Sequence, residues 1–313
     1  MYQFIALMLQ ESMLKYIQKG EIDIDKWNAL VKHSENANIF CFSWYLDQFC
    51  SWDAIVLDDY KGAIALPQTK KYGFKAVYQP EFIQKCNWFG AQNKDVREIE
   101  NILLKHYKRI RFNTNLPLFE EHYRKERPNY ILHLSSSYSE ISSNYSTNIK
   151  RNINKAANNL EYKKCSPAIC YTLYRDRYEN LPNSINRFQF EKLSNLIQAQ
   201  SDYFKVQCVQ SKDELTASCI YVYNAVHKRI HYILGSPTDL GRRLNSMTML
   251  HNKLIKEHSN SSWVFDFEGS EIESVGTFYR KFGTTNEPFW EINLTQGLLL
   301  KTLERIYKMF KRL

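Results

Sequence analysis

The stretch FDFEGSEIESVGTFYRKFG, residues 265–283, carries the pattern that most constrains the fold. It begins with alternating aromatic and acidic residues, which is the period-two pattern of a strand. A Gly-Ser pair follows, and then a helical pattern that ends at Gly283, because glycine readily takes the left-handed conformation found after a helix. Alternation over the predicted strand 263–269 places Asp266 and Glu268 on the same face.

Outward from this stretch, the last third of the chain alternates between strand and helix patterns. The predicted strands are 204–210, 214–224, 229–236, 263–269 and 288–294. The predicted helices are 188–200, 247–258 with Asn245 or Ser246 as its N-cap, and a segment from Ser270 or Glu271 to Gly283. This order predicts an α/β unit with a mixed sheet.

The first half of the chain repeats a shorter version of this order. The predicted strands are 52–57, 62–67, 73–78, 108–113 and 129–135, with a helix at 94–107. A Ser-rich stretch after them predicts one helix, because its apolar residues Ile141, Tyr145, Ile149, Ile153 and Ala156 fall at helical spacing. We therefore expect an α/β fold (α+β mixed sheets) of two similar units in tandem, residues 1–128 and 129–313.

The composition is that of a folded, basic protein. The 313 residues include 42 lysines and arginines against 33 acids, which gives a net charge of +9 and a pI near 9.0. This excess favours an anionic partner, such as a phosphorylated cofactor, a nucleic acid or an anionic membrane face. A basic, solvated surface explains the same excess without a partner.

The sequence shows no clear targeting signal and no motif of paired cysteines. The first twenty residues have no basic segment and no cleavage site, so we interpret them as an extra helix or an over-long start, with Met13 as an alternative start. No apolar run approaches the about 18 residues that span a membrane. The seven cysteines form no CxxC motif, which predicts a reducing compartment without structural disulfides, and hence a cytoplasmic protein.

The order of elements and the final helix resemble the GNAT acyltransferase superfamily. GTFYRKFG places Tyr279 and Gly283 in the Y-x-x-x-G relation of that family's signature helix. The DFEGS run, the segment NYSTNIKRNINKAANNL (144–160) and SWYLDQFCSWDAIVLDDYKGAIALP (43–67) resemble the FemAB-like branch, including uncharacterised bacterial members, in which two GNAT domains are joined. The resemblance covers about residues 20–294 and implies that Tyr279 protonates the departing thiolate of coenzyme A.

The same resemblance assigns the loop GSPTDLGRRLNS, residues 235–246, to the pyrophosphate of coenzyme A. The family loop reads Q/R-x-x-G-x-G/A, whereas Gly241 has no second glycine two residues further on, so Arg242 and Arg243 would supply donors in its place. The predicted cofactor contacts are Gly235, Ser236, Gly241, Arg242, Arg243, Asn245 and Ser246. FemAB-type enzymes use aminoacyl-tRNA instead of acyl-CoA, so a degenerate loop fits that branch too.

Acyl transfer to an amine requires a base for the amine and an acid for the leaving group. We expect Glu268 to act as this base or to hold the amine, Asp266 to be its structural partner, and Tyr279 to be the acid. The structural alternatives are that Asp266 bonds a loop amide, Glu268 caps the next helix and Tyr279 is a core residue.

Four further residues are candidates for substrate binding. Tyr232 would line the cleft, Ser270 would touch the substrate, and Lys150 and Arg151 would hold phosphates. Their structural alternatives are a core position, a helix N-cap and a solvated helix face. His231 and His251 are interpreted as core or surface groups, and no metal site is predicted.

The function expected from these features is N-acyl transfer from a thioester, acetyl-CoA or another acyl-CoA, to an amine of a small molecule or peptide. The donor would be a co-substrate rather than a tightly bound cofactor. One alternative is a FemAB-type aminoacyltransferase that uses aminoacyl-tRNA on a peptidoglycan-precursor-like amine. The other is a non-catalytic binding module with a GNAT fold. The sequence indicates neither the acceptor nor the oligomeric state.

Overall fold

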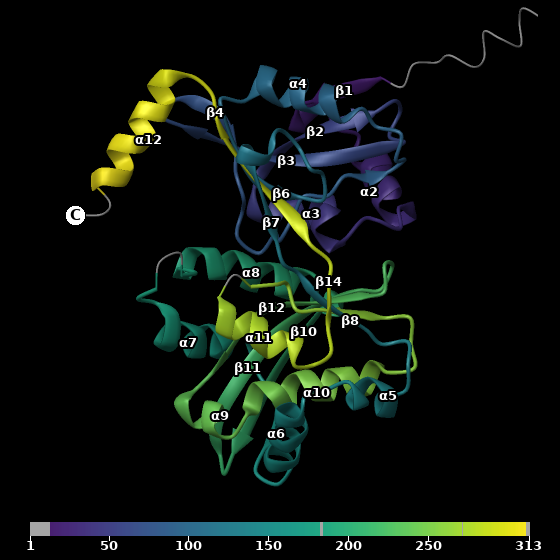
Figure 1. Ribbon diagram of the computed structural model, residues 1–313, viewed down its shortest axis with the longest axis vertical. Coiled ribbons are helices and arrows are strands. Elements are labelled where there is room, and N and C mark those ends of the chain that lie inside the picture. Colours follow the sequence, from purple (N-terminus) through teal and green to yellow (C-terminus); the bar gives the residue numbers. More distant parts are fainter. Residues whose placement is uncertain (1–12, 182–183, 271, 311–313) are drawn as a thin grey trace, which may run out of the picture. The chain divides into compact units, whose positions relative to one another are not determined.

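The chain forms two units, and its last strand returns to the first of them (Figure 1). The computed structural model describes residues 13–181, 184–270 and 272–310. The first unit holds the residues up to Glu126 and those from Phe289 onward, and the second unit is Arg127–Pro288. We expected 289–313 in the second unit, but β15 (Phe289–Thr295) pairs along its length with β6 (Arg109–Thr114) and therefore belongs to the first sheet.

The first unit is built on a sheet with the strand order β1-β2-β3-β4-β6-β15-β7. The other strands are β1 (Leu14–Ile17), β2 (Ser51–Leu57), β3 (Gly62–Lys71), β4 (Phe74–Val77), β7 (Arg124–Arg127) and β5 (Phe89–Gly90), which pairs with β3. The helices are α2 (Ile24–His33), α3 (Ser43–Phe49), α4 (Val96–His106) and α12 (Leu298–Phe310). The core packs the fully buried indoles of Trp27 and Trp52 at 4.7 Å between ring centroids.

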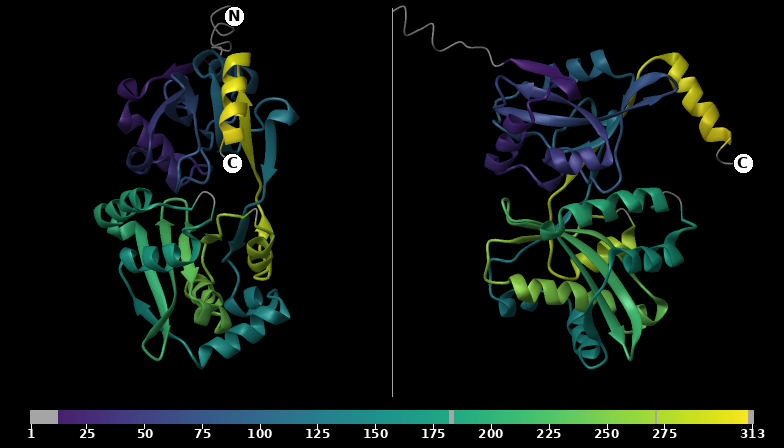
Figure 2. Two further views of the ribbon diagram at one scale, coloured as in Figure 1. Left: turned by 90° about the vertical axis from the view of Figure 1, so that its left-hand side faces the viewer. Right: turned by 180° about the vertical axis from the view of Figure 1, so that it is seen from behind.

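The second unit is built on a sheet with the order β14-β8-β13-β12-β11-β10-β9. The strands are β8 (Tyr130–His133), β9 (Glu161–Lys164), β10 (Phe204–Ser211), β11 (Glu214–Asn224), β12 (Arg229–Pro237), β13 (Val264–Asp266) and β14 (Thr285–Asn286). The helices are α5 (Tyr138–Ser143), α6 (Thr147–Ala157), α7 (Pro167–Tyr178), α8 (Arg187–Ala199), α9 (Asp239–Arg243), α10 (Ser246–His258) and α11 (Glu273–Arg280). Figure 2 shows helices on both faces of this sheet, with α10 and α6 on one side and α7 on the other.

The Ser-rich segment is helical, as its apolar spacing predicts, but it forms two helices instead of one. Helix α5 ends at Ser143, and Ser146 then caps α6 by accepting a hydrogen bond from the amide of Ile149. The amide of Ser146 itself donates to the carbonyl of Lys281. This long-range bond holds the chain between the two helices in a conformation that local spacing does not indicate.

The expectation of unpaired cysteines is wrong at one pair, because Cys165 and Cys208 form a disulfide. Cys165 directly follows the edge strand β9, which pairs antiparallel with β10, and Cys208 lies on β10. The two α-carbons are 6.0 Å apart, within the usual range for a disulfide. The sequence pattern did not predict β9, so this proximity was hidden, and the inference of a reducing compartment loses its basis.

Two further predictions concern the N-terminal segment and membrane-spanning helices. The first twenty residues are interpreted as an extra helix or an over-long start, and residues 1–12 of this segment lie outside the described residues. The helix interpretation is wrong for the part that is described, because Leu14–Ile17 form strand β1, which pairs with β2. Within the part of the chain that the structure describes, none of the helices has both the length and the apolar character needed to cross a bilayer.

The core of the second unit contains an unusual polar residue, His251 on α10. Its imidazole is fully buried among aromatic rings that include Phe265 and Phe267, and its Nδ1 lies 3.0 Å from the hydroxyl of Tyr221. Burial lowers the pKa of His251 to about 3, because the charged form would lose its hydration. The histidine is thus a neutral structural group, as one of its sequence interpretations expected.

This buried histidine makes the stability of the second unit depend on pH. The pKa of His251 falls from 6.5 in the unfolded chain to about 3 in the fold, so the unfolded chain gains the proton first as the pH falls. Between about pH 7 and about pH 5, this group should lower the free energy of unfolding by about 2 kcal/mol. Chemical denaturation of the wild type and of His251→Asn at both pH values measures the difference. An equal pH dependence in both proteins would contradict the assignment.

Candidate functional site

The parallel strands β12 and β13 pair over three residues and then separate. Arg229–His231 of β12 lie beside Val264–Asp266 of β13, after which β12 continues to Pro237 while β13 ends. A β-bulge in the pairing with β11, opposite Ile220 and Tyr221, bends β12 at the same level. We call the place where residues 232–237 and 267–269 no longer pair the fork.

Strand β13 is shorter than the predicted 263–269 because the backbone turns at its end. Glu268 and Gly269 both have left-handed conformations, with φ of 65° and 68°. A Cβ at position 269 would lie 2.2 Å from the carbonyl oxygen of Pro128, so only glycine fits there. A positive φ at a glutamate is uncommon, and such strained residues gather at functional sites. The turn, rather than strand alternation, brings the carboxylates of Asp266 and Glu268 together.

The carboxylate of Asp266 fixes the end of the β12–β13 pairing, where the fork begins. It is fully buried, and its Oδ2 lies 2.6 Å from Nη2 of Arg229 and 3.3 Å from Nδ2 of Asn129. Its Oδ1 accepts the backbone N–H of Glu268 at 2.8 Å. Arg229 also pairs with Glu287 at 2.5 Å. Burial alone would lower the pKa of Arg229, but the charges of Asp266 and Glu287 outweigh it and raise that pKa.

Glu268 is paired with a residue that the sequence did not single out for function. Its Oε1 lies 2.5 Å from Nδ1 of His231, whose imidazole is buried on β12. The side chain of Glu268 keeps 16% of its surface exposed, and the buried imidazole orients its carboxylate. His231 also lies 3.6 Å from Oδ2 of Asp266. A carboxylate held in this way can accept a proton in a fixed position.

The same three groups have the residue types of a metal site. Ligand atoms of His231, Asp266 and Glu268 all lie within 4.8 Å of one another. The guanidinium of Arg229, however, contacts the same Oδ2 of Asp266 that a cation would need, at 2.6 Å and 2.8 Å. A divalent ion would be placed next to this fixed positive charge, so the arrangement suits proton transfer better than metal binding.

Tyr279 on α11 lies between the two branches of the fork. Its ring centroid is 6.5 Å from that of Tyr232 on the β12 branch and 4.8 Å from that of Phe267 after β13. The residue is only 6% exposed and belongs to the aromatic core of the unit. Burial, with the nearby charges of Tyr178 and Glu268, raises the pKa of the Tyr279 phenol. The phenol therefore keeps its proton at neutral pH, in the form that an acid requires.

The residues predicted to contact a cofactor mostly turn inward. Ser236 donates to the carbonyl of Leu173, and a Cβ at Gly235 would lie 2.3 Å from the hydroxyl of Tyr232. Gly241 is required for packing, because a Cβ there would lie 1.8 Å from the carbonyl oxygen of Thr216. Any contact of these three residues with an acyl donor would therefore have to come from their backbone atoms.

Most of the backbone amides named in this loop also donate their hydrogen bonds to acceptors within the loop. The amide of Gly241 donates to the hydroxyl of Thr238, and the amides of Arg242, Leu244 and Asn245 donate to carbonyls within the loop. The side chains of Arg242 and Arg243 are exposed. A glycine-rich cradle of free amides, as the family resemblance implies, is therefore not formed by residues 241–245.

The N-terminus of α10 differs from the loop that precedes it. Asn245 is the N-cap, with a left-handed φ of 62°, and its side chain makes no capping hydrogen bond. Ser246 is fully buried and donates its hydroxyl to Thr216. The first-turn amides of α10, together with the arginines just before them, are the part of the loop suited to an anion.

The remaining predicted residues lie apart from the fork or near its edge. The hydroxyl of Ser270 accepts the amide of Ile272, ahead of α11, whose N-cap is Ile272 rather than Ser270. Lys150 donates to the carbonyl of Ser143, and Arg151 is exposed on α6. Neither cation contacts a residue of the fork within the described parts of the chain.

The first unit has a similar parallel pair, but its opening is filled by the chain itself. Strands β4 and β6 pair at Val77 and Ile110, after which β4 ends and β6 continues beside β15. The amide of Asn113 then donates to the side chain of Gln79 at 2.7 Å, and its carbonyl accepts the amide of Cys86 at 2.8 Å. The second unit therefore carries the candidate site.

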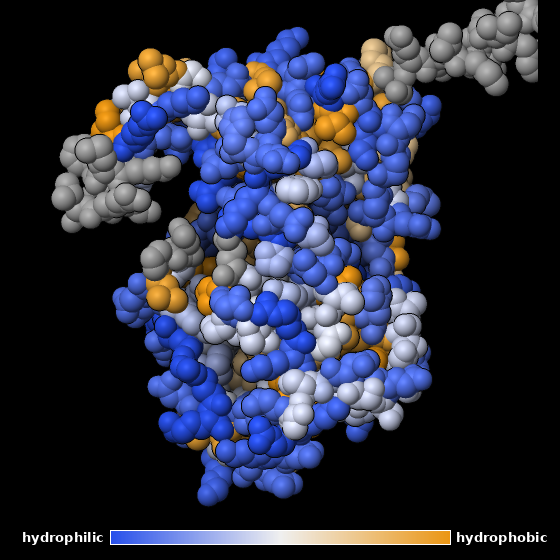
Figure 3. All heavy atoms as spheres, in the orientation of Figure 1, coloured by the Kyte–Doolittle hydropathy of each residue, from blue (hydrophilic) through white to orange (hydrophobic). Residues whose placement is uncertain are grey.

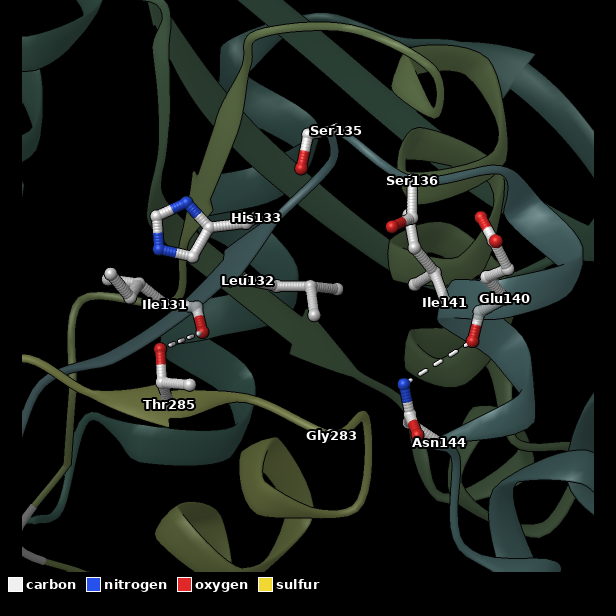
Figure 4. A pocket seen from close by; sticks show the side chains of 10 residues that line it. All are labelled: Ile131, Leu132, His133, Ser135, Ser136, Glu140, Ile141, Asn144, Gly283 and Thr285. Carbon is white, nitrogen blue, oxygen red and sulfur yellow. Dashed lines mark hydrogen bonds between the residues drawn. The ribbon is translucent and has the colours of Figure 1, made fainter.

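A separate pocket of about 190 Å³ opens beside β8 and α5 in the second unit (Figure 4). It is lined by Ile131, Leu132, His133, Ser135, Ser136, Glu140, Ile141, Asn144, Gly283 and Thr285. None of the predicted site residues lines it. Asn144 donates to the carbonyl of Glu140, whose carboxylate caps α5 at Ser137. The polar groups of the pocket are thus partly used within the protein.

Comparison with solved structures decides the fold. FemX superimposes with a TM-score of 0.61 at 10% identity over 89% of this chain and 97% of its own. The C-terminal domain of a putative lysylphosphatidylglycerol synthetase from Agrobacterium fabrum gives 0.56 at 9% identity, over 86% and 91%. A protein of unknown function from Bacteroides thetaiotaomicron gives 0.56 at 11% identity, over 90% and 100%. No family model and no curated sequence matches the chain.

This chain has the FemAB/GNAT-like fold. The expected mixed α/β fold class is confirmed. The ring of Tyr279, which the Y-x-x-x-G spacing singled out, lies beside Tyr232 and Phe267 at the fork.

Sequence reasoning assigned no role at the fork to three residues: His231, Arg229 and Glu287. Each lies in a different part of the chain from Glu268. The usable signal was the predicted order of strand 229–236, helix 247–258 and strand 263–269, because a helix between two strands is typical of a parallel pair, which would place His231 beside the acidic strand. Without the register of that pairing, the histidine could not be assigned.

The network predicts unequal roles for the two acids that hold Arg229. Asp266→Asn should lower the free energy of unfolding by about 3 kcal/mol, because it leaves a buried guanidinium without its buried partner. Glu287→Gln removes the same charge from the same arginine but should cost less than about 1 kcal/mol, since Glu287 is 41% exposed. Denaturant unfolding compares both variants with the wild type, and equal losses would argue against Asp266 as the anchor.

Proposed function

We propose that this protein transfers an acyl group from an activated carboxyl donor to an amine, at the fork of the second unit. The observation that carries the proposal is the position of Tyr279. Its ring centroid lies 6.5 Å from that of Tyr232 on one branch of the fork and 4.8 Å from that of Phe267 on the other, and Glu268 is close enough for its charge to raise the pKa of the phenol. An acid and a base thus lie near each other at the fork, as acyl transfer requires.

The reaction can be written for the residues of the fork. The nitrogen of the neutral amine attacks the carbonyl carbon of the donor, and Glu268, oriented by His231, accepts the proton that this nitrogen loses as the new carbon–nitrogen bond forms. The carbon–leaving-group bond breaks as the tetrahedral intermediate collapses, and Tyr279 gives its proton to the leaving atom. The products are an amide and the protonated thiol or hydroxyl. Asp266 takes no part in proton transfer and fixes the backbone of Glu268.

Two donors are consistent with this chemistry: an acyl-CoA thioester and an aminoacyl ester of tRNA. The first-turn amides of α10 and the exposed Arg242 and Arg243 support a phosphate-containing donor of either kind. The self-satisfied loop amides of residues 241–245 favour the aminoacyl ester, because they do not form the cradle that coenzyme A occupies in GNAT proteins.

The pKa of Tyr279 is a second observation in favour of an ester. Proton transfer to a leaving group is downhill only when that group is more basic than the acid. An ordinary thiol has a pKa of about 8.5, below that of a free phenol, and burial raises the pKa of Tyr279 further. A ribose alkoxide is far more basic than a thiolate, so it takes the phenol proton more readily.

A thermal-shift comparison separates the donors. The probes are acetyl-CoA, desulfo-CoA and a 3′-aminoacylamino nucleoside that mimics the end of charged tRNA. A ligand present at about 100 times its dissociation constant should stabilise the fold by about 2.7 kcal/mol. We expect a shift with the nucleoside mimic that is larger than the shift with acetyl-CoA. The reverse order would support the thioester donor, and no shift with any probe would favour a site without donor binding.

With the stabilising donor, Tyr279→Phe should lower kcat about a hundredfold without loss of stability, because only the hydroxyl is removed. Product release from the donor, measured in the presence of an amine panel, reports the rate. Tyr130→Phe is the matched control, since its ring packs 6.1 Å from that of Tyr279 but its hydroxyl binds Arg280. A Tyr279→Phe variant that turns over like Tyr130→Phe would remove the phenol from the mechanism.

Glu268→Gln should lower kcat/KM and flatten the acid limb of its pH profile, because the amide cannot accept the amine proton. Glu273→Gln is the matched control: this acid also precedes Tyr279 but is exposed and bonded to Arg280 and Thr277. Retention of the wild-type pH profile in Glu268→Gln would exclude it as base. Donor binding without turnover in the wild type, over the whole amine panel, would instead support a non-catalytic module.

A further inference from the structure

The first unit exposes an apolar surface on its last helix, α12. Among the described residues, four of the large exposed apolar side chains fall within ten positions of α12: Leu298, Leu299, Ile306 and Tyr307, with 80%, 65%, 45% and 53% exposed. Figure 3 shows apolar side chains at the surface over this helix. Such a concentration of apolar groups on one element is rare on a free surface.

Helix α12 is anchored by one face only. Leu300 is 2% exposed, and Glu304, one turn later, binds Lys71 of β3 at 3.0 Å and Arg109 of β6 at 2.8 Å. Its second oxygen accepts the hydroxyl of Thr295 at 2.9 Å. Leu299 and Ile306, at i and i+7, share a different face of the helix and point away from these contacts. The helix is therefore fixed to the unit while its apolar stripe remains outside.

The β3–β4 hairpin of the same unit adds to this surface. Its tip carries Tyr72, which is 42% exposed and has a left-handed φ of 51°. The ring of Tyr72 lies 6.5 Å from that of Tyr307, edge to face. The sequence around the tip is KKYGFK, so the aromatic ring is surrounded by lysines. We call Tyr72, Leu298, Leu299, Ile306 and Tyr307 the apolar patch.

The charge around the apolar patch has one sign. Lys301 and Arg305 on α12 and Lys70 in the hairpin are exposed, and neither Lys301 nor Arg305 has an acidic partner among the described residues. The acid of the helix, Glu304, is already neutralised by Lys71 and Arg109. An apolar stripe with cations on the adjoining face and a tyrosine at its edge is the arrangement of helices that lie in the interface of an anionic bilayer.

We propose that the apolar patch docks the first unit on an anionic phospholipid surface. Leu299 and Ile306 enter the boundary between head groups and acyl chains, Tyr72 and Tyr307 lie at the level of the head groups, and Lys70, Lys301 and Arg305 pair with lipid phosphates. The proposal concerns residues of the first unit alone and does not depend on the chemistry at the fork.

Vesicle sedimentation of the full chain tests this docking. The probes are vesicles of phosphatidylglycerol with phosphatidylethanolamine, and vesicles of phosphatidylcholine. We expect binding to the anionic vesicles that weakens as salt is added, and about tenfold weaker partition for the double variant Leu299→Gln, Ile306→Gln. Lys301→Gln with Arg305→Gln should weaken binding to anionic vesicles and leave the small binding to phosphatidylcholine unchanged.

Two controls separate docking from loss of fold and from self-association. Phe188→Gln with Val226→Gln removes exposed apolar groups from the second unit and should bind as the wild type does. Melting curves should coincide for all variants, because the substituted side chains are exposed. The proposal is overturned if the wild type binds both vesicle types equally, or if Leu299→Gln with Ile306→Gln binds as the wild type does. It is equally overturned if light scattering shows a dimer that this variant dissociates, without vesicle binding.

Discussion

The buried carboxylate of Asp266 is the interaction on which the candidate site depends. It binds the guanidinium of Arg229 from β12, the amide of Asn129 ahead of β8, and the backbone N–H of Glu268. One charged group therefore ties two segments that are distant in sequence to the end of β13 and fixes the turn that follows this strand. Because a buried charge is costly unless it is paired, any conformation that loses these partners is strongly disfavoured. The geometry of the fork follows from this requirement.

Each unit contains a parallel pair of strands that separate, but the two units differ in what lies between the separated strands. In the second unit, the branches separate around Tyr279, and the turn at Glu268 and Gly269 directs a partly exposed carboxylate toward His231. In the first unit, the corresponding edge of β6 is covered by the chain's own segment around Gln79 and Cys86. Filling the opening leaves the first unit without a site of this kind but with a stable sheet edge. The first unit presents instead the apolar patch on α12 and the hairpin.

Local patterns located most elements and part of the site. Strand β11 begins and ends where its alternation predicts, and Gly283 has the left-handed φ of 73° that a residue after a helix requires. The Y-x-x-x-G spacing placed Tyr279 on the helix that faces the fork. The predicted strand 263–269 was too long, because alternation does not reveal that a carbonyl of Pro128 leaves room only for glycine at 269. The loop prediction did not reveal the hydrogen bonds that already occupy the amides of this loop.

The sequence by itself determined the periodicity of the strands and helices, the excess of positive charge, and the residue types available for acyl transfer. These properties depend on neighbours along the chain, within about one or two helical turns. The tertiary structure decided the return of β15 to the first sheet, the pairing of Cys165 with Cys208, and the meeting of His231 with Glu268. Each of these joins residues tens to hundreds of positions apart. Their contact is set by strand register and burial, which no local pattern records.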